Sequence, residues 1–270
     1  MFRRHFTFLD YTTQSDLSLS KSMQNIKLKI AYDGQAYFGW QKTPAGPSVE
    51  KTLQKNLEQI LQHAISLQAA SRTDKGVHAR GQIVNFLTTK SITDLQKFIL
   101  SLNSLLPTDL RILSAEKMPS TFHPTLNCIA KEYCYYICYD FVQLPEYRPY
   151  SWHCPFPLML GKMAQAISVL IGEHDFSAFC NLKKNVNYTD YIRRVQAIHL
   201  EVLNHKRLCI RIKGNHFLYK MVRNIVGTLI YVGKGKLMVE DIPSILQSQD
   251  RKMAGVTAPA HGLFLQTVLY

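Results

Sequence analysis

The order of apolar patterns in this 270-residue chain predicts an α+β fold of two related domains, with mainly antiparallel sheets flanked by helices. Apolar residues make up 46% of the chain, which is ample for packed cores. A strand–helix–strand–helix–strand order covers residues 25–118, and a similar strand–helix–strand–strand–helix–strand order covers residues 119–270. Pro119 and Pro124 lie between the two runs, so the domain boundary is expected there.

Alternating apolar residues mark the strands of the first domain, and a 3.6-residue apolar period marks its helices. The expected elements are a strand at 26–32, a helix at 49–61, a strand at 82–87, a helix from about 95 and a strand at 110–118. Ser48 is placed to cap the first helix, and Thr93 with Gln96 forms a capping box for the second. Residues 1–24 are rich in Ser, Thr and Gln without a sustained period, and we expect a mobile N-terminal extension.

The second domain shows the same kinds of pattern. The expected elements are a strand at 131–139, a helix from about 160 that stops at Gly172, a hairpin of strands at 198–202 and 208–212, a helix from about Phe217 to Gly233 and a strand at 263–270. Tyr133, Tyr135 and Tyr139 fall on one face of the first of these strands.

The chain carries a formal charge of +13, from 32 Lys and Arg against 19 Asp and Glu. Such a cationic surface favours a polyanionic partner, with nucleic acid as the first candidate and an anionic membrane surface as the second. A soluble basic protein without such a partner is the plainer alternative. The apolar stretch at 225–232 is far shorter than the roughly 20 residues needed to span a bilayer. No apolar signal core follows Met1 before Asp10, so we expect a cytoplasmic protein.

The cysteines do not indicate a metal site or a disulfide framework. The six of them include no C-x-x-C pair and no zinc spacing, so buried free thiols are expected. The histidines show no metalloprotease spacing either, and we predict no metal.

Residues 72–81, RTDKGVHARG, place a single carboxylate, Asp74, in a short polar turn ahead of a strand-like stretch. Two arginines and a lysine lie within about eight positions of it, and opposite charges favour its ionised form. An ionised carboxylate can act as a nucleophile or a general base, and it is a poor proton donor near neutral pH. Aspartate is also common in turns for structural reasons alone, so the surrounding residues decide between these interpretations.

The string around Asp74 resembles the catalytic motif of the TruA-type tRNA pseudouridine synthases, and further motifs follow in that family's order. The matching segments are 32–34, 37–41, 72–79, 81–86, 122–124, 130–135, 174–179, 221–227 and 258–263. Each segment alone would be weak, whereas their combination over about residues 25–270 is highly specific.

The resemblance implies the pseudouridine synthase fold, with halves similar to RRM or ferredoxin-like domains. It implies isomerisation of uridine to pseudouridine in the anticodon stem-loop of tRNA, at tRNA positions 38–40. The N1–C1′ bond breaks, the uracil turns, and C5 bonds to C1′, without any cofactor. The resemblance also implies a homodimer in which one tRNA spans both subunits.

The resemblance assigns a role to five residues. Asp74 is the nucleophile, and attack on C1′, attack on C6 and assisted glycal formation all remain open. Arg223 is the ionic partner of Asp74, and Arg72 holds the flipped-out nucleotide and contacts the RNA backbone. Tyr133 packs against the target base and helps to remove the C5 proton, and Leu263 lines the same pocket. The plainer alternatives are two surface arginines, a core tyrosine and a core leucine.

Three positions depart from the family pattern. Ser71 and Lys75 stand where the family often has Gly and Ala, and Glu132 stands where a basic residue is common. These differences concern RNA contacts and substrate range. Basic clusters at 183–184, 193–194 and 234–236 are further candidates for phosphate contacts. The rival functions are an RNA-binding module without catalysis and a related synthase with a different RNA target.

Overall fold

The computed structural model describes residues 23–182 and 188–270. Most of the expected extension at 1–24 and the basic pair at 183–184 lie outside the described residues. Strand β1 begins at Gln24, one residue before the expected start of the first domain.

The first half contains the predicted elements in the predicted order. They are β1 (Gln24–Tyr32), α1 (Val49–Leu61), β3 (His78–Thr88), α2 (Leu95–Leu105) and β4 (Leu110–Met118), with a short strand β2 (Gln68–Ala69) before β3. The apolar positions that predicted α1 are its buried face, which confirms that helix.

The two helix N-termini of this half test the capping predictions. Ser48 caps α1, since its hydroxyl accepts a 3.3 Å hydrogen bond from the Lys51 amide, as predicted. The capping box of Thr93 and Gln96 is wrong by one residue. Asp94 is the N-cap of α2, and its carboxylate accepts a 2.9 Å hydrogen bond from the Lys97 amide. Aspartate caps a helix at least as well as threonine does, and here Asp94 occupies the N-cap position instead of Thr93.

The second half has the predicted elements and several shorter ones. They are β5 (Ala130–Cys138), β6 (Trp152–His153), α3 (Leu160–Leu170), β7 (Gly172–Asp175), β8 (Ile192–Leu203), β9 (Arg207–Gly214), α4 (Met221–Gly233), α5 (Asp241–Ser248) and β10 (Leu263–Leu269). The start of α4 at Met221 corrects the prediction of Phe217, because Lys220 has a left-handed φ of 61° and interrupts the helical pattern. Helix α5 was not predicted. It has only eight residues, and Pro243, which is unfavourable inside helices, lies in its first turn, so the local sequence does not indicate a helix.

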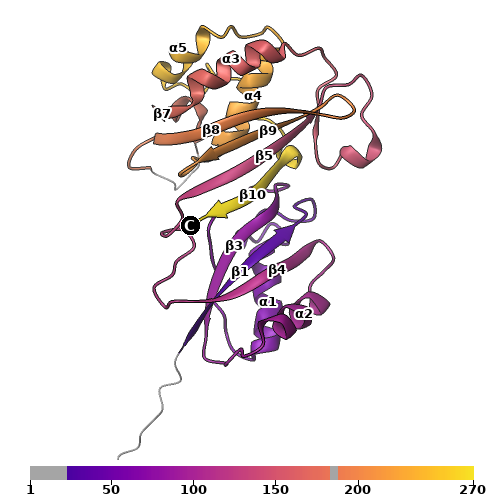
Figure 1. Cartoon of the computed structure of the whole chain (residues 1–270), viewed down its shortest axis with the longest axis vertical. Coiled ribbons are helices and arrows are strands. Elements are labelled where there is room, and N and C mark those ends of the chain that lie inside the picture. Colours follow the sequence, from indigo (N-terminus) through magenta and orange to yellow (C-terminus); the bar gives the residue numbers. More distant parts are fainter. Residues whose placement is uncertain (1–22, 183–187) are drawn as a thin grey trace, which may run out of the picture.

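All strands within residues 23–182 and 188–270 join one ten-stranded sheet, with the main order β4-β1-β3-β10-β5-β9-β8-β7. Neighbours are antiparallel except for β10 with β3 and β5 with β6. The α+β class with a mainly antiparallel sheet is therefore confirmed, but the sheet runs through both halves (Figure 1). The division into two related domains at 25–118 and 119–270 stays a prediction.

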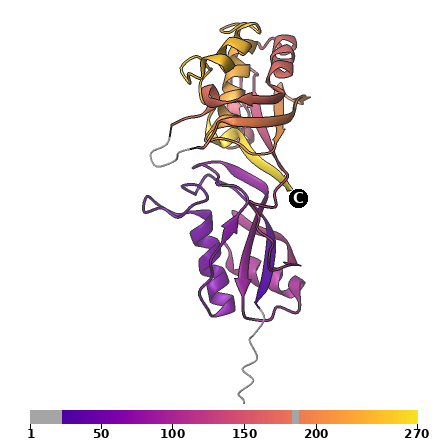
Figure 2. The same cartoon turned by 90° about the vertical axis from the view of Figure 1, so that its left-hand side faces the viewer.

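The molecule is elongated, and the two halves lie at opposite ends of its long axis (Figures 1 and 2). Helices α1 and α2 lie with the first half and α3, α4 and α5 with the second, while β10 runs between them (Figure 1). One apolar cluster extends through both halves. All six cysteines are buried and free, as predicted. In the described ranges, no helix has the length and apolar character needed to cross a membrane.

Candidate active site

Asp74 lies in the turn that leads into β3, close to where the two halves meet. The Val77 amide donates a 3.1 Å hydrogen bond to the Asp74 carbonyl, and Gly76 adopts a φ of 78° that closes the turn. The Asp74 side chain is 24% exposed, so the turn presents its carboxylate without sealing it from solvent.

The segment after β1 packs directly against this turn. The Trp40 amide donates to the Thr73 carbonyl at 3.0 Å, and the Tyr32 and Thr73 hydroxyls are 2.8 Å apart. Gly39, with a φ of 103°, lies so close that an added Cβ would be 2.7 Å from the Thr73 carbonyl oxygen. The motifs at 32–34 and 37–41 therefore support the position of Asp74 through one side-chain contact and one backbone contact to Thr73.

Arg223, on the first turn of α4, forms an ion pair with Asp74. Its Nη1 lies 2.9 Å from Asp74 Oδ2, and its Nε donates a 2.7 Å hydrogen bond to the Ala258 carbonyl. The Arg223 side chain is only 12% exposed. Two contacts on different edges of one planar guanidinium fix its orientation, and that orientation in turn fixes one oxygen of the carboxylate.

Close packing against α4 places the segment that holds Arg223. A Cβ on Gly227 would overlap the Val256 carbonyl, so only glycine allows this approach. Asn224 donates a 2.6 Å hydrogen bond to the Phe179 carbonyl, and its Oδ1 accepts one of 2.7 Å from the Thr257 hydroxyl. The motifs at 174–179, 221–227 and 258–263 thus meet around α4.

Tyr133, on β5, is buried with 7% of its surface exposed. A 2.7 Å hydrogen bond joins its hydroxyl to that of Ser71, and its ring meets Phe217 edge to face at 5.3 Å. Burial raises the pKa of the Tyr133 phenol to about 12; the nearby Asp74 charge acts in the same direction, and the Ser71 hydrogen bond opposes it. The neutral phenol dominates near neutral pH, which favours ring packing over proton removal by a phenolate.

Leu263 and Arg72, the other two predicted site residues, differ in their exposure to solvent. Leu263 is buried at the start of β10 and pairs with Tyr135, which lies two residues from Tyr133 on the same face of β5. Arg72 is exposed beside the turn, and within the described parts of the chain it forms no hydrogen bond or ion pair. Asp74, Arg223 and Tyr133 therefore lie close together, Leu263 pairs with Tyr135 on the sheet face that Tyr133 shares, and Arg72 lies exposed beside the turn.

The three departures from the family pattern have distinct surroundings. Ser71 makes the contact with Tyr133, and the Lys75 ammonium lies 3.6 Å from the centroid of the Phe38 ring. Glu132 forms an ion pair of 3.2 Å with Arg211 on the face of β5 opposite to Tyr133.

The basic clusters are partly engaged within the protein. Arg193 pairs with Asp190 at 2.9 Å, and the Lys234 and Lys236 ammonium groups lie over aromatic rings at 4.0 and 5.2 Å. Arg194 is exposed.

Sequence reasoning missed several residues that build the site. Ser71 was noticed only as a departure, although its position three residues before Asp74 put it within reach of the site. Asn224 lies next to Arg223 in the segment at 221–227, and no function was predicted for it. The Ala258 carbonyl offered no signal, because backbone acceptors are identical at every position of a sequence.

This arrangement leaves one oxygen of Asp74 for a substrate. Oδ2 is held by Arg223, and no donor among the described residues contacts Oδ1. A half-buried carboxylate that is oriented at one oxygen and free at the other is suited to nucleophilic or basic chemistry.

Comparison with known proteins agrees with this geometry. A family model described as tRNA pseudouridine synthase matches residues 29–125 and 166–270. The tRNA pseudouridine synthase A 2 of Protochlamydia amoebophila (strain UWE25) is 97% identical over 262 residues, which cover 97% of this chain and 100% of that protein. The tRNA pseudouridine synthase A of Thermoanaerobacter sp. (strain X514) is 41% identical over 248 residues, covering 92% of this chain and 100% of that protein.

Among solved structures, an archaeal box H/ACA sRNP Nop10-Cbf5 complex is similar at a TM-score of 0.36 and 11% identity. The match covers 76% of this chain and 43% of that chain, and a likeness this low adds nothing to the assignment. The family model and the close relatives are sufficient by themselves. The chain belongs to the tRNA pseudouridine synthase family and is an isomerase.

Proposed function

We propose that this isomerase converts uridine to pseudouridine in the anticodon stem-loop of tRNA, at tRNA positions 38–40, with Asp74 as the nucleophile. The observation that carries the proposal is the 2.9 Å ion pair of Arg223 with one oxygen of Asp74, which leaves the other oxygen for the substrate. Pure RNA binding does not require a carboxylate among cations, so the pair favours catalysis over a binding module.

The reaction needs no net oxidation and no external group. The N1–C1′ bond of the uridine breaks, the uracil turns, C5 bonds to C1′, and the C5 proton leaves while N1 gains one. Asp74 can attack C1′, attack C6, or assist the formation of a glycal. In all three routes the carboxylate must be fixed in direction, and the 2.9 Å contact with the Arg223 guanidinium holds one of its oxygens in place.

A uridine in a stem must leave the helix before Asp74 can reach it. Tyr133 offers an aromatic face that compensates for the stacking lost on flipping, and Leu263 forms an apolar wall beside it. Arg72, exposed next to the turn, is placed to hold the backbone of the flipped nucleotide. We infer that Tyr133 acts mainly through its ring, since its raised pKa keeps the phenol protonated.

We further infer a homodimer in the cytoplasm, with one tRNA spanning both subunits. The formal charge of +13 supports a polyanionic substrate that contacts a surface larger than the catalytic site. The dimer rests on the family resemblance and is tested by sedimentation with and without tRNA.

The test is tritium release from unmodified tRNA carrying [5-³H]uridine, with wild type and Asp74→Ala side by side. Bond formation at C5 expels the label, so we expect release by the wild type only, with RNA binding retained in the variant. Turnover by Asp74→Ala would remove the nucleophile assignment. Mapping of the modified nucleotides then decides the target: modification outside tRNA positions 38–40 would show a related synthase with another target.

A further inference from the structure

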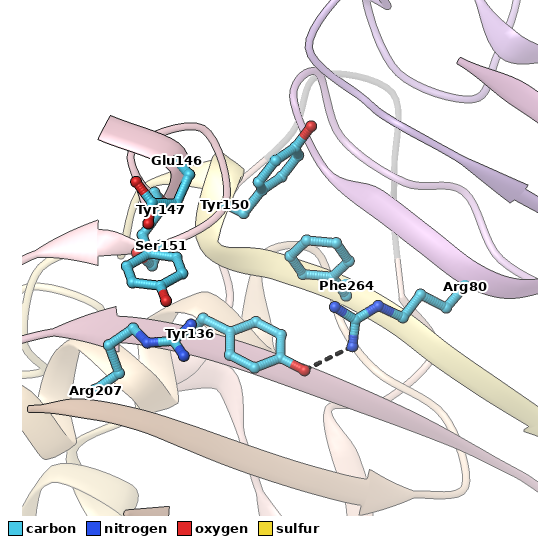
Figure 3. A pocket seen from close by; sticks show the side chains of 8 residues that line it. All are labelled: Arg80, Tyr136, Glu146, Tyr147, Tyr150, Ser151, Arg207 and Phe264. Carbon is cyan, nitrogen blue, oxygen red and sulfur yellow. Dashed lines mark hydrogen bonds between the residues drawn. The ribbon is translucent and has the colours of Figure 1, made fainter. Parts of the chain in front are cut away.

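A pocket separate from the Asp74 site lies on the face of the sheet opposite to the Tyr133 side chain. Its volume is about 330 Å³, and it opens between the sheet and the segment at 144–151 (Figure 3). Its walls are formed by Arg80, Tyr136, Glu146, Tyr147, Tyr150, Ser151, Arg207 and Phe264. This volume is at the lower end of the roughly 300–1,000 Å³ typical of small-ligand sites.

Strand alternation separates this pocket from the catalytic site. Successive side chains of a strand point to opposite faces, so Tyr136 faces away from Tyr133 and Tyr135, and Phe264 faces away from Leu263. The same two neighbouring strands, β5 and β10, therefore contribute to the Asp74 site on one face and to the pocket on the other. None of the residues assigned to the reaction lines the pocket.

Aromatic rings form the floor and rim of the pocket. Phe264 and Tyr136 meet edge to face at 5.4 Å, and His78 stacks behind Phe264 at 4.5 Å. Tyr150 lies 6.2 Å from Phe264 and is held by a 2.7 Å hydrogen bond to Asp33. In Figure 3 the Tyr147 ring points from the covering segment toward the sheet, the Tyr150 ring extends in the opposite direction, and Tyr136 and Phe264 come from strands of the sheet.

Two guanidinium groups flank these rings. Arg80 lies 4.6 Å from the Phe264 centroid and donates to the Tyr136 hydroxyl at 2.6 Å, and Arg207 lies 3.7 Å from the Tyr147 centroid. Among the residues that the structure describes, neither arginine forms an ion pair with a carboxylate, although Glu146 also lines the pocket. Both positive charges are therefore available to an anion.

We propose that this pocket binds one unstacked nucleotide of the RNA that the enzyme modifies, with the base against the tyrosine rings and its phosphate at Arg207 and Arg80. Aromatic faces beside guanidinium groups are the usual means of holding an unpaired base and its phosphate. The Glu146 carboxylate can accept a hydrogen bond from an exocyclic amino group. The inference rests on the proposed RNA substrate and assigns it a second base-binding site away from Asp74.

Photo-crosslinking locates the bound base directly. Two tRNA transcripts, one containing 4-thiouridine and one containing 6-thioguanosine, are bound to full-length Asp74→Ala and irradiated, and the crosslinked peptides are identified by mass spectrometry. We expect crosslinks within 144–151 or at Tyr136 in addition to those near Tyr133. Crosslinks near Tyr133 with none in the pocket from either transcript would overturn the inference and leave the proposed function intact.

Two pocket variants and a matched control test the energetics. Tyr147→Ala should weaken tRNA affinity and raise KM by about five-fold to a hundred-fold, the range for one stacked base, with kcat nearly retained at saturating tRNA. Arg207→Met should make the plot of log affinity against log salt shallower by about 0.7–0.9, the effect of one lost phosphate contact. Arg148→Met removes the same charge from the same segment outside this pocket and should change neither quantity.

The controls separate this inference from its alternatives. Unchanged affinity in both pocket variants, with free energies of unfolding equal to wild type, would refute the inference. A change of oligomeric state in sedimentation, with tRNA affinity per subunit preserved, would show instead that the pocket binds a second copy of the chain. Absence of tritium release by the wild type would refute the proposed function, and crosslinks in the pocket would still report RNA binding there.

Discussion

Replacement of Arg223 tests the central contact of the site. Arg223→Met keeps most of the side-chain volume and removes both the 2.9 Å ion pair with Asp74 and the 2.7 Å hydrogen bond to the Ala258 carbonyl. A hydrogen bond to a charged group contributes about 1.5–3 kcal/mol. If the Asp74 contact is realised in the transition state, its loss lowers kcat by about ten-fold to more than a hundred-fold.

Arg223→Lys separates charge from geometry. Lysine restores a positive charge, but its single ammonium cannot reproduce a planar fork that contacts the carboxylate and the carbonyl on two edges. We expect kcat for Arg223→Lys between those of Arg223→Met and wild type. Single-turnover tritium release at saturating tRNA measures the chemical step, and tRNA affinity is measured in parallel.

The control for this experiment is stability, because a partly buried carboxylate without its partner also weakens the fold. Turnover is therefore compared at a temperature where each variant is shown to be folded. A fully folded Arg223→Met whose single-turnover rate is within two-fold of wild type would refute the reasoning that Arg223 orients Asp74.

Three further predictions concern Tyr133, Gly227 and salt. The folded pKa of Tyr133 is raised from 10.0 to about 12, so its burial contributes stability that is present below about pH 10 and is lost as the pH rises through about 12. As the pH rises from about 10 to about 12, the free energy of unfolding should therefore fall less for Tyr133→Phe than for wild type. Chemical denaturation measures this fall, and an equal fall in both proteins would contradict the raised pKa of Tyr133. Gly227→Ala should lower the free energy of unfolding by about 1–3 kcal/mol and reduce turnover, since its Cβ would overlap the Val256 carbonyl. Gly161→Ala, with open space around its Cβ, is the matched control and should not destabilise the protein. Affinity for tRNA should fall by at least about ten-fold between 50 and 200 mM salt, and a flat response in filter binding would exclude several phosphate contacts.

The sequence predicted the long elements because their signals are local. The apolar spacing of α1 and the alternation of β1 and β9 reflect the face that each buries, and the structure confirms all three. The errors arise where a local signal is ambiguous or absent. Thr93 and Asp94 are both good caps, and nothing in the residues near Phe217 reveals the left-handed conformation of Lys220.

The candidate site was predictable only in part, because its contacts join residues that are far apart in the sequence. Asp74 and Arg223 are 149 residues apart, and their pairing was expected from resemblance to a family and not from either residue's neighbours. The hydrogen bond between Ser71 and Tyr133 and the contact of Arg223 with the Ala258 carbonyl depend on how the chain packs. Neither contact has a local sequence signature.

The position of β10 explains how these distant residues form one site. This last strand pairs in parallel with β3 through only two residue pairs, Phe264 with His78 and Leu265 with Ala79, and pairs with β5 on its other edge. His78 begins the strand that follows the Asp74 turn, so the register of β10 fixes Leu263 and Tyr133 relative to that turn. Successive side chains of β10 point to opposite faces of the sheet, so Leu263 lies on the face of Tyr133 and Phe264 lines the pocket of Figure 3 on the other face. A change in β10 register by one residue would exchange these faces and disrupt both sites at once.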